Sequence, residues 1–203
     1  MKLESIRADV LNAARAFDKT EKDLVYGEGD ENAAVMLIGE APGAEETRLL
    51  RPFVGKAGKN LDEFLFALKL RRQEIYITNV VKFRPYKQSE KGTLSNRPPE
   101  KQELAAMTPL LLREIEAVAP RVVVTLGNVP LKALHGSSAT IGVSHAVPVA
   151  AHGLSHRFML FPLYHPASII YNRALKAVYD EDLKKLRSFL DTIGIKPTHK
   201  HNL

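Results

Sequence analysis

Residues 34–43 read AVMLIGEAPG, a run of five apolar residues followed by a glycine-bounded turn that carries Glu40. A short and almost wholly apolar run is typical of a strand buried on both faces, as the strands of parallel sheets are. Three more runs of this kind follow, at residues 75–80, 122–126 and 158–163. Because helical patterns separate the runs, the sequence predicts an α/β fold. We expect a three-layer α/β/α sandwich around a central, mainly parallel, four-stranded sheet.

Three segments between or after these runs have helical spacing. In the first segment, apolar residues at helical spacing form one stripe: Leu61, Phe64, Leu65 and Leu68. The second begins at Pro98 and Pro99 and runs to Val118, and Pro109 inside it is expected to kink or split the helix. The third covers residues 173–190, with leucines and a tyrosine on one face.

The chain has 203 residues, of which 45% are hydrophobic and 26% charged, a balance typical of one globular domain. We expect a single domain over residues 1–195 and a flexible tail over residues 196–203. Cysteine is absent, which excludes disulfides, thiolate catalysis, iron–sulfur clusters and cysteine-ligated zinc. No apolar run is long enough to span a membrane, and the first residues do not form a signal peptide. We therefore expect a cytoplasmic protein, and we expect a monomer because no long apolar stripe is left over for a partner.

Basic residues outnumber acidic residues along the chain. The 29 Lys and Arg residues against 23 Asp and Glu residues give a formal net charge of +6, which favours an anionic partner, most simply nucleic acid. Positive charge is dense in the polar segment 82–101, within which residues 86–95 are expected to form an exposed loop. For any single lysine there, a solvated surface position is the simpler interpretation.

Chemically distinctive residues follow the predicted strands. Glu40 follows the first strand, Asn79 ends the second, and His165 follows the fourth. In open α/β sheets ligands bind outside the carboxyl ends of the strands, so these three residues are expected to converge on one crevice. A carboxylate stabilises positive charge or orients a water, an amide reads the edge of a base, and an imidazole donates to a developing oxyanion. Each residue alone has a plain interpretation as a turn or capping residue; their joint placement favours a site.

Other catalytic patterns are absent from the sequence or weak. No G-x-S-x-G motif occurs, which argues against a serine hydrolase. His152 and His156 are four residues apart, but the residues between them favour a turn, and no acidic cluster accompanies them. His199 and His201 lie in the predicted tail. We therefore predict no metal site.

Three sequence blocks carry the most specific signal. The first is GEAPGAEETRLLRPFVGKAG at residues 39–58. The second is TNVVKFRP at residues 78–85, followed by NRPPE at residues 96–100. The third is YHPASIIYNR at residues 164–173. In this order the blocks resemble the family 4 branch of the uracil-DNA glycosylase superfamily, and the resemblance extends over residues 26–190.

The resemblance implies a DNA repair enzyme that flips uracil out of DNA and reads it in a pocket. It implies that Phe53 stacks on the uracil ring. It also implies that Asn79 pairs with uracil O4 and N3–H and rejects cytosine, whose donor pattern is reversed at this edge. Glu46 and Asn96 match positions that line the same pocket in the family.

The resemblance also assigns the catalytic groups. The backbone N–H of Ala41 and the side chain of His165 would hold uracil O2, where negative charge builds as the base leaves. Glu40 would face C1′ of the sugar, stabilise the oxocarbenium-like ion and position the attacking water. Hydrolysis of the N-glycosidic bond then releases uracil and leaves an abasic site.

DNA contacts are implied in two regions. Basic residues that would hold phosphates without reading sequence lie in the segment 82–101: Lys82, Arg84 and Arg97. The loop after His165 would wedge into the DNA where the base has left, through Ser168, Ile169, Ile170, Tyr171 and Arg173. The expected partner is uracil-containing DNA, and the expected product is free uracil.

The chain departs from the family 4 pattern at three places. Four cysteines that hold an iron–sulfur cluster in that pattern are replaced here by Asn12, Arg15, Phe83 and Met107. We therefore expect no cofactor, and we expect Phe83 and Met107 to fill that space with apolar packing. Leu49 and Leu50 stand where the pattern has a glycine, which is expected to narrow or reshape the pocket mouth. An apparent insertion at residues 87–94 lengthens the loop near the DNA.

Several functions remain open at this point. The leading one is a monofunctional uracil-DNA glycosylase that uses water as its nucleophile. A second is a DNA-binding protein that has kept the pocket but lost useful catalysis, which the missing cluster and the two leucines motivate. Covalent trapping of DNA, which a relative performs with a histidine in the loop before the stacking Phe, is disfavoured because residues 47–51 contain no histidine. A glycosylase for another deaminated base and an enzyme acting on free nucleosides or nucleotides are further alternatives.

Overall fold

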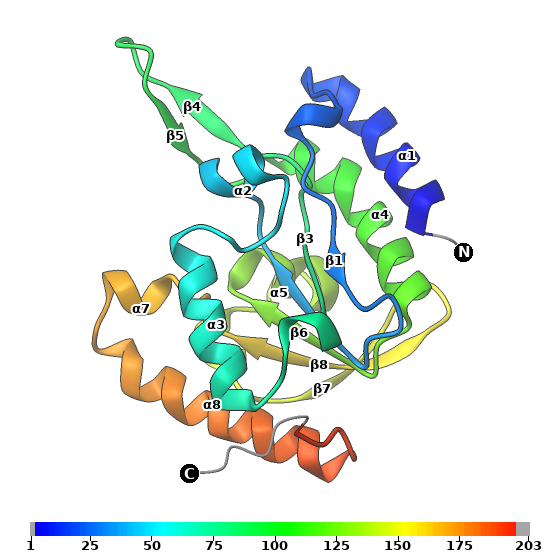
Figure 1. Ribbon diagram of the computed structural model, residues 1–203, viewed down its shortest axis with the longest axis vertical. Helices are drawn as coiled ribbons and strands as arrows, with labels where there is room; N and C mark the ends of the chain where they lie inside the picture. Colours follow the sequence, from blue (N-terminus) through cyan, green and yellow to red (C-terminus); the bar gives the residue numbers. More distant parts are fainter. Residues whose placement is uncertain (1–2, 198–203) are drawn as a thin grey trace.

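The computed structural model in Figure 1 has one large sheet between two layers of helices. The structure describes residues 3–197, apart from the side chains of residues 56, 57, 59, 60, 170 and 171. Of the expected tail, residues 198–203 lie outside the described residues. The sheet has six strands in the order β1-β3-β2-β6-β8-β7. Their bounds are β1 (Glu28–Gly29), β2 (Val35–Gly39), β3 (Tyr76–Asn79), β6 (Val122–Leu126), β7 (Val149–His152) and β8 (Arg157–Leu163).

The four predicted strands form the parallel centre of the sheet. Strand β2 pairs in parallel with β3 and β6, and β6 pairs in parallel with β8, which confirms the α/β class. The predicted number of strands is wrong, because β1 and β7 add antiparallel edges. Strand β1 has only two residues, one of them glycine, and β7 is only partly buried. Neither edge strand therefore carries the continuous apolar run that marked the central strands.

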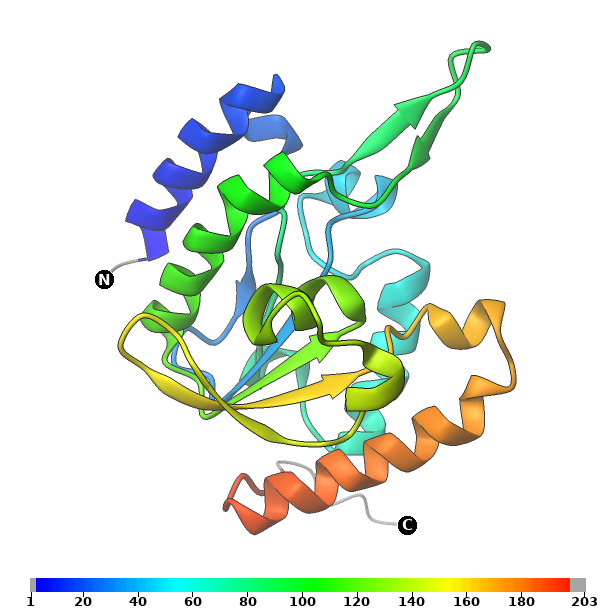
Figure 2. The same ribbon diagram turned by 180° about the vertical axis from the view of Figure 1, so that it is seen from behind.

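Helices cover both faces of the sheet (Figures 1 and 2). The longer helices are α1 (Leu3–Ala14), α3 (Lys56–Leu68), α4 (Lys101–Val118), α5 (Asn128–His135) and α8 (Leu175–Thr192). The short ones are η1 (Arg15–Phe17), η2 (Glu21–Asp23), α2 (Ala44–Leu49), η3 (Arg72–Glu74), α6 (Ile141–Ser144) and α7 (Ser168–Tyr171). No helix in the described part of the chain is long and apolar enough to cross a membrane.

Two apolar cores lie on opposite faces of the sheet. On strand β2, Met36 and Ile38 pack into the core shared with α1 and α4, and Leu37 packs into the core shared with α3 and α8. This alternation follows from the two-residue period of a strand. It establishes the three predicted layers.

Helix α4 runs without interruption through Pro109, so of the predicted kink or split the split does not occur. Proline has no N–H group, so the carbonyl oxygen of Ala105 has no helical donor at position 109. Because Pro109 is exposed, this carbonyl lies on the solvent side of the helix, where it can accept a hydrogen bond from water. Helix α1, which the sequence patterns did not reveal, packs against α4 through one apolar stripe. Asp9 and Arg113 join the two helices by an ion pair of 2.7 Å.

Residues 86–95, expected as a loop, form most of a β-hairpin. Strand β4 (Tyr86–Gln88) pairs antiparallel with β5 (Leu94–Asn96), in a sheet separate from the central one. Every residue of both strands is exposed, as the sequence indicated. The strands were missed because each has only three residues and little apolar character.

Candidate active site

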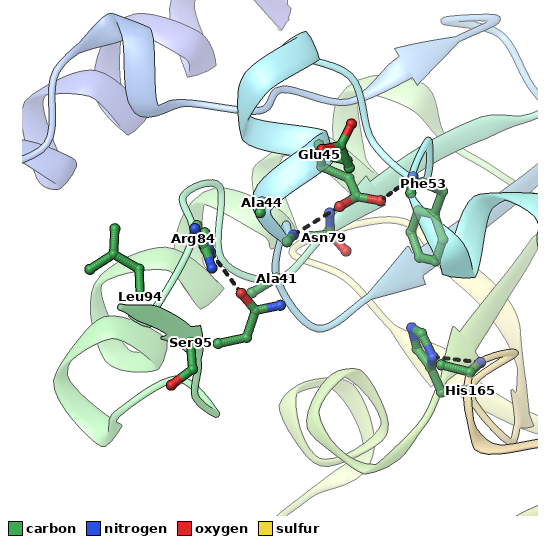
Figure 3. A pocket seen from close by; sticks show the side chains of 14 residues that line it. Ala41, Ala44, Glu45, Phe53, Asn79, Arg84, Leu94, Ser95 and His165 are labelled. Carbon is green, nitrogen blue, oxygen red and sulfur yellow. Dashed lines mark hydrogen bonds between the residues drawn. The ribbon is translucent and has the colours of Figure 1, made fainter. Parts of the chain in front are cut away.

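A cavity of about 540 Å³ opens beyond the carboxyl ends of β2 and β3 (Figure 3). The predicted site residues that line it are Ala41, Glu46, Phe53, Asn79, Arg84, Asn96 and His165. They come from segments spread along the chain, brought together by the parallel order of the strands. A volume of roughly 300–1,000 Å³ is typical of small-molecule pockets. The cavity therefore has room for a flipped nucleoside.

Gly39, the last residue of β2, forms the floor between two of these side chains. A methyl group at this position would lie 2.4 Å from Asn79 Oδ1 and 2.4 Å from Phe53 Cζ. Both side chains are nearly buried, with 3% of Asn79 and 5% of Phe53 exposed. Only glycine leaves room for an amide edge and an aromatic ring to meet here.

The Glu46 carboxylate holds the backbone around Phe53 in place by hydrogen bonds. Its Oε1 accepts hydrogen bonds from the backbone N–H groups of Gly55 at 2.7 Å and Val54 at 3.2 Å, and its Oε2 accepts one from Gly43 at 3.2 Å. The carboxylate thus joins the turn after β2 to the turn after Phe53. Although Glu46 lines the cavity, these contacts give it a positioning role.

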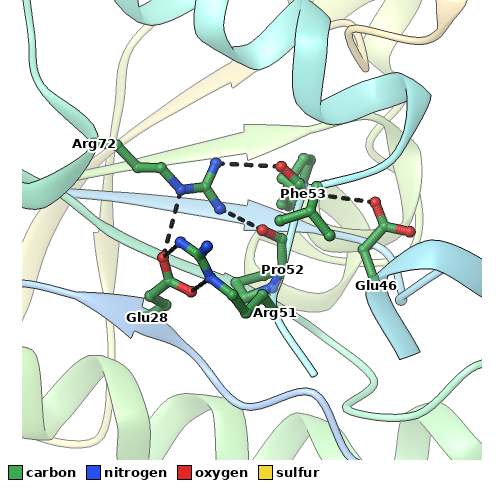
Figure 4. A network of polar contacts seen from close by, with 7 residues as sticks. Glu28, Glu46, Arg51, Pro52, Phe53 and Arg72 are labelled. Carbon is green, nitrogen blue, oxygen red and sulfur yellow. Dashed lines mark hydrogen bonds and ion pairs between the residues drawn. The ribbon is translucent and has the colours of Figure 1, made fainter. Parts of the chain in front are cut away.

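A second set of polar contacts supports Phe53 from the opposite side (Figure 4). Arg72 donates to the carbonyl oxygens of Phe53, at 3.2 Å, and Pro52. Glu28 accepts two hydrogen bonds from Arg51, at 2.7 and 2.6 Å, and lies 3.5 Å from Arg72. Phe53 itself has a positive φ of 52°, an uncommon conformation for a bulky residue that such contacts help to hold.

Glu28 and Arg72 were not predicted as functional residues. They lie in the two-residue strand β1 and the one-turn helix η3, outside every quoted motif. The only available signal was the cation Arg51 inside the first block, which implied an acidic partner without identifying it.

His165 faces Phe53 across the cavity, with ring centroids 6.0 Å apart and planes inclined by 25°. Its Nδ1 accepts a hydrogen bond from the backbone N–H of Ala167 at 3.1 Å. Burial lowers the pKa of His165 to about 4. At neutral pH the imidazole is therefore uncharged, and because Nδ1 accepts, the ring proton lies on Nε2.

Of the two predicted catalytic residues, His165 lines the cavity and Glu40 does not, although its neighbour Ala41 does. The Glu40 side chain is half-buried. Burial raises the pKa of its carboxyl group, because desolvation disfavours the charged form. The Glu40 carbonyl oxygen accepts the backbone N–H of Val81 at 3.1 Å, which fixes the turn against the end of β3.

Asn96 and Arg84 form the wall of the cavity on the hairpin side. Arg84 Nε donates to Asn96 Oδ1 at 2.7 Å. The amide nitrogen of Asn96 points toward the turn after β2, since a methyl group at Gly43 would lie 3.3 Å from it. The base of the hairpin is thus fixed to the pocket.

The structure corrects the assignment of Lys82 as a phosphate contact. Only 2% of Lys82 is exposed. Its ammonium group lies 2.5 Å from Glu114 Oε2 and 2.5 Å from Thr78 Oγ1, and it donates to the Asn79 carbonyl oxygen at 2.7 Å. Burial lowers the pKa of Lys82 and the Glu114 charge opposes that shift. A buried and paired lysine cannot reach DNA.

The other residues predicted to contact DNA differ in how exposed their side chains are and whether these are already paired. Arg97 forms a bidentate ion pair with the buried Glu103, in which its two Nη atoms donate to the two carboxylate oxygens at 2.7 and 2.8 Å. After His165, Ser168 is half-buried, Ile169 packs against the core between the sheet and α3, and Arg173 is exposed. The side chains of Ile170 and Tyr171 lie outside the described residues.

The positions that correspond to cluster-binding cysteines do not fit an iron–sulfur group. Phe83 and Met107 are fully buried in the core next to α1 and α4. The Phe83 ring packs against Phe17, with centroids 5.4 Å apart. Asn12 and Arg15 are exposed and bonded to each other at 3.2 Å. Apolar packing therefore occupies the place where thiolates would be needed.

Among the described residues no group of three or more His, Asp or Glu side chains could hold a metal ion. His199 and His201 lie outside the described residues. Leu49 and Leu50 are exposed and do not line the cavity, so the expected narrowing of its mouth is not observed.

Comparison with known proteins agrees with this geometry. A sequence model of the uracil DNA glycosylase superfamily matches residues 26–187. A type-4 uracil-DNA glycosylase of Sulfurisphaera tokodaii is 35% identical over 94% of this chain and 86% of its own length. Similar enzymes of Saccharolobus solfataricus and Pyrobaculum aerophilum are 36% and 37% identical, over 86% and 81% of this chain and 79% and 82% of their own lengths. The chain belongs to the uracil DNA glycosylase superfamily.

Proposed function

We propose that the protein is a uracil-DNA glycosylase that binds an everted uracil in the cavity and hydrolyses its N-glycosidic bond. The observation that carries the proposal is the placement of Phe53, Asn79 and His165 around one cavity. Family membership and the identity to type-4 enzymes support the same reaction.

Asn79 and Phe53 recognise the base. The Phe53 ring provides a flat apolar surface for stacking. The Asn79 amide offers a donor to uracil O4 and an acceptor to N3–H. Cytosine has a donor at C4 and an acceptor at N3, so it would leave both amide groups unpaired in a site from which water is excluded.

His165 and the N–H of Ala41 stabilise the leaving base. As the bond from C1′ to N1 breaks, its electron pair moves into the uracil ring and negative charge builds on O2. The neutral His165 donates from Nε2. Its Nδ1 accepts the backbone N–H of Ala167, so the single ring proton stays on Nε2. A fixed donor in a buried site stabilises such charge without reorganisation.

Glu40 acts on the sugar side. Its carboxylate stabilises the positive charge at C1′ and orients a water, whose oxygen bonds to C1′. The proton that this water loses passes through solvent to the departing uracil anion, so both products are neutral. The products are free uracil and an abasic site, and no redox cofactor takes part. The proposal includes a monomeric enzyme located in the cytoplasm.

The test is a strand-cleavage assay. The purified protein is incubated with an oligonucleotide containing one uracil and then with alkali, which breaks the strand at an abasic site. A break at the uracil, and none in matched thymine or cytosine strands, is expected. Tight binding of the uracil strand by folded protein without any break would favour the binding-protein alternative. Cleavage at another deaminated base in preference to uracil would favour a different specificity.

A further inference from the structure

The β4–β5 hairpin projects from the body of the protein beside the cavity (Figures 1 and 2). Its strands pair only with each other, and all six of their residues are exposed. A two-stranded ribbon with no covering layer is marginally stable on its own in water. An extension of this kind is therefore suited to a surface that is covered when the substrate binds.

One face of the hairpin continues the wall of the cavity. The register pairs Tyr86 with Asn96 and Gln88 with Leu94, so these four side chains share one face, and Lys87 lies on the other. Leu94 and Asn96 of this face line the cavity, and so does Ser95 between them, whose register partner is Lys87. Tyr86 and Leu94 are large apolar side chains with 40% and 43% of their surface exposed. Next to a pocket for one nucleotide, this face is suited to the sugar or base of the adjoining nucleotide.

Positive charge gathers on the same face. Lys19 Nζ lies 4.6 Å from the centre of the Tyr86 ring, and the Arg84 guanidinium lies 5.9 Å from it. Lys19 comes from the loop after α1, far from the hairpin in sequence. Residues 82–99 contain a single acidic residue, Glu90. Two cations beside an exposed aromatic ring complement a phosphate that lies next to a stacked base.

The cavity lies between two projections. Residues that line it include Leu94 and Ser95 of the hairpin and Ala167, which directly precedes α7. Figure 1 shows the hairpin and α7 extending on the same side of the molecule, with α2 and the start of α3 between them. A strand that inserts one nucleotide into the cavity would pass both projections.

We propose that the β4–β5 hairpin, with Lys19, holds the DNA strand on the side of the flipped nucleotide opposite α7. This inference rests on the proposed function for the identity of the ligand. Tyr86 and Leu94 contact the flanking nucleotide, and Lys19 and Arg84 neutralise its phosphate. The contact is independent of base sequence, because it uses stacking and charge.

The test compares Tyr86→Ala and Lys19→Ala with the matched control Lys87→Ala, which removes an equal charge from the opposite face of the hairpin. Binding is measured by fluorescence anisotropy with a single-stranded oligonucleotide carrying a tetrahydrofuran abasic analogue, which requires no catalysis. Tyr86→Ala is expected to weaken binding by about tenfold. Lys19→Ala is expected to reduce the slope of log affinity against log salt by about 0.7. Lys87→Ala is expected to change neither.

Truncated oligonucleotides locate the contact. The loss in Tyr86→Ala is expected to disappear when the strand is shortened on one flank of the abasic analogue and to persist when it is shortened on the other. Equal losses with both shortened strands, or equal effects of Lys19→Ala and Lys87→Ala, would overturn the proposal.

Failure of the hairpin proposal is distinct from failure of the proposed function. If the wild type releases uracil but the three variants all bind alike, only the hairpin proposal fails. If the expected binding pattern is found in a protein that releases no uracil, only the glycosylase function fails. Thermal unfolding of each variant checks that the exposed substitutions leave the fold intact.

Discussion

Lys82 Nζ donates a hydrogen bond of 2.7 Å to the main-chain oxygen of Asn79, from a position almost without access to solvent. The same ammonium group pairs with Glu114 of α4, whose other carboxylate oxygen accepts the Tyr76 hydroxyl at 2.9 Å. Asn79, which we propose reads the base, is thus tied to the helix layer by a buried ion pair. Lys82 of the second sequence block therefore supports the pocket from below and does not reach toward DNA.

Replacing Lys82 by Met tests this support. The variant leaves the Glu114 carboxylate buried and unpaired, which is expected to lower the free energy of unfolding by about 3–5 kcal/mol. The double variant Lys82→Met with Glu114→Leu removes both charges and is expected to recover only part of this loss, because the buried hydroxyls of Tyr76 and Thr78 then lose their acceptor. Urea unfolding of the three proteins measures the effect. A single variant as stable as the wild type would show that the pair does not hold this region together.

Gly39→Ala tests the close approach of the amide and the ring. The added methyl group would displace Asn79 or Phe53, and misplacement of substrate-contacting groups is expected to lower kcat/KM by about 100-fold. Gly142→Ala is the matched control, because a methyl group there has no neighbour within 4 Å. Both variants are compared in uracil release and in thermal unfolding. If Gly39→Ala were folded and fully active, the proposed pocket floor would be wrong.

Asn79→Asp tests the reading of the base. An ionised carboxylate cannot donate to uracil O4, so the preference for uracil over cytosine is expected to fall, mainly through loss of uracil cleavage. Competition between uracil and cytosine strands in one reaction measures the preference. An undiminished preference in the variant would contradict the assigned role.

The neutral state of His165 predicts a dependence on pH. The folded protein has a His165 pKa of about 4, against 6.5 for an unperturbed histidine. The unfolded chain therefore binds a proton that the folded chain does not, and this contribution lowers the stability as the pH falls from about 6.5 to about 4. Above about pH 6.5, the contribution of His165 to the stability no longer changes with pH. NMR titration of labelled histidine, assigned with His165→Gln, is expected to show a resonance titrating near the lower value; titration near the ordinary value would contradict a buried neutral imidazole.

The central strands and the convergence of their ends were predictable from sequence. Apolar runs such as 122–126 mark strands buried on both faces, and parallel order then places Asn79 and His165 at one edge. Short elements were not predictable, because strands such as β1 and β4 have too few residues to show a period. Their formation depends on partners supplied by the tertiary structure.

Side-chain environments were the least predictable feature of the site. Lys82 and Arg84 lie two residues apart in one basic segment, yet Lys82 is buried against Glu114 and Arg84 lines the cavity. Strand-like alternation would put residues two apart on the same side of the chain, so the different surroundings of Lys82 and Arg84 depend on the path of the chain after β3. Arg72 and Glu28 support Phe53 through contacts between distant segments, which one sequence does not reveal.

The most direct measurement of the central claim is the stoichiometry of base release. The protein is incubated with DNA containing uracil at one position, and free uracil and abasic sites are quantified in the same sample. The account predicts one uracil for each abasic site, with an intact backbone before alkali treatment. DNA bound by folded protein, with neither product formed, would contradict it.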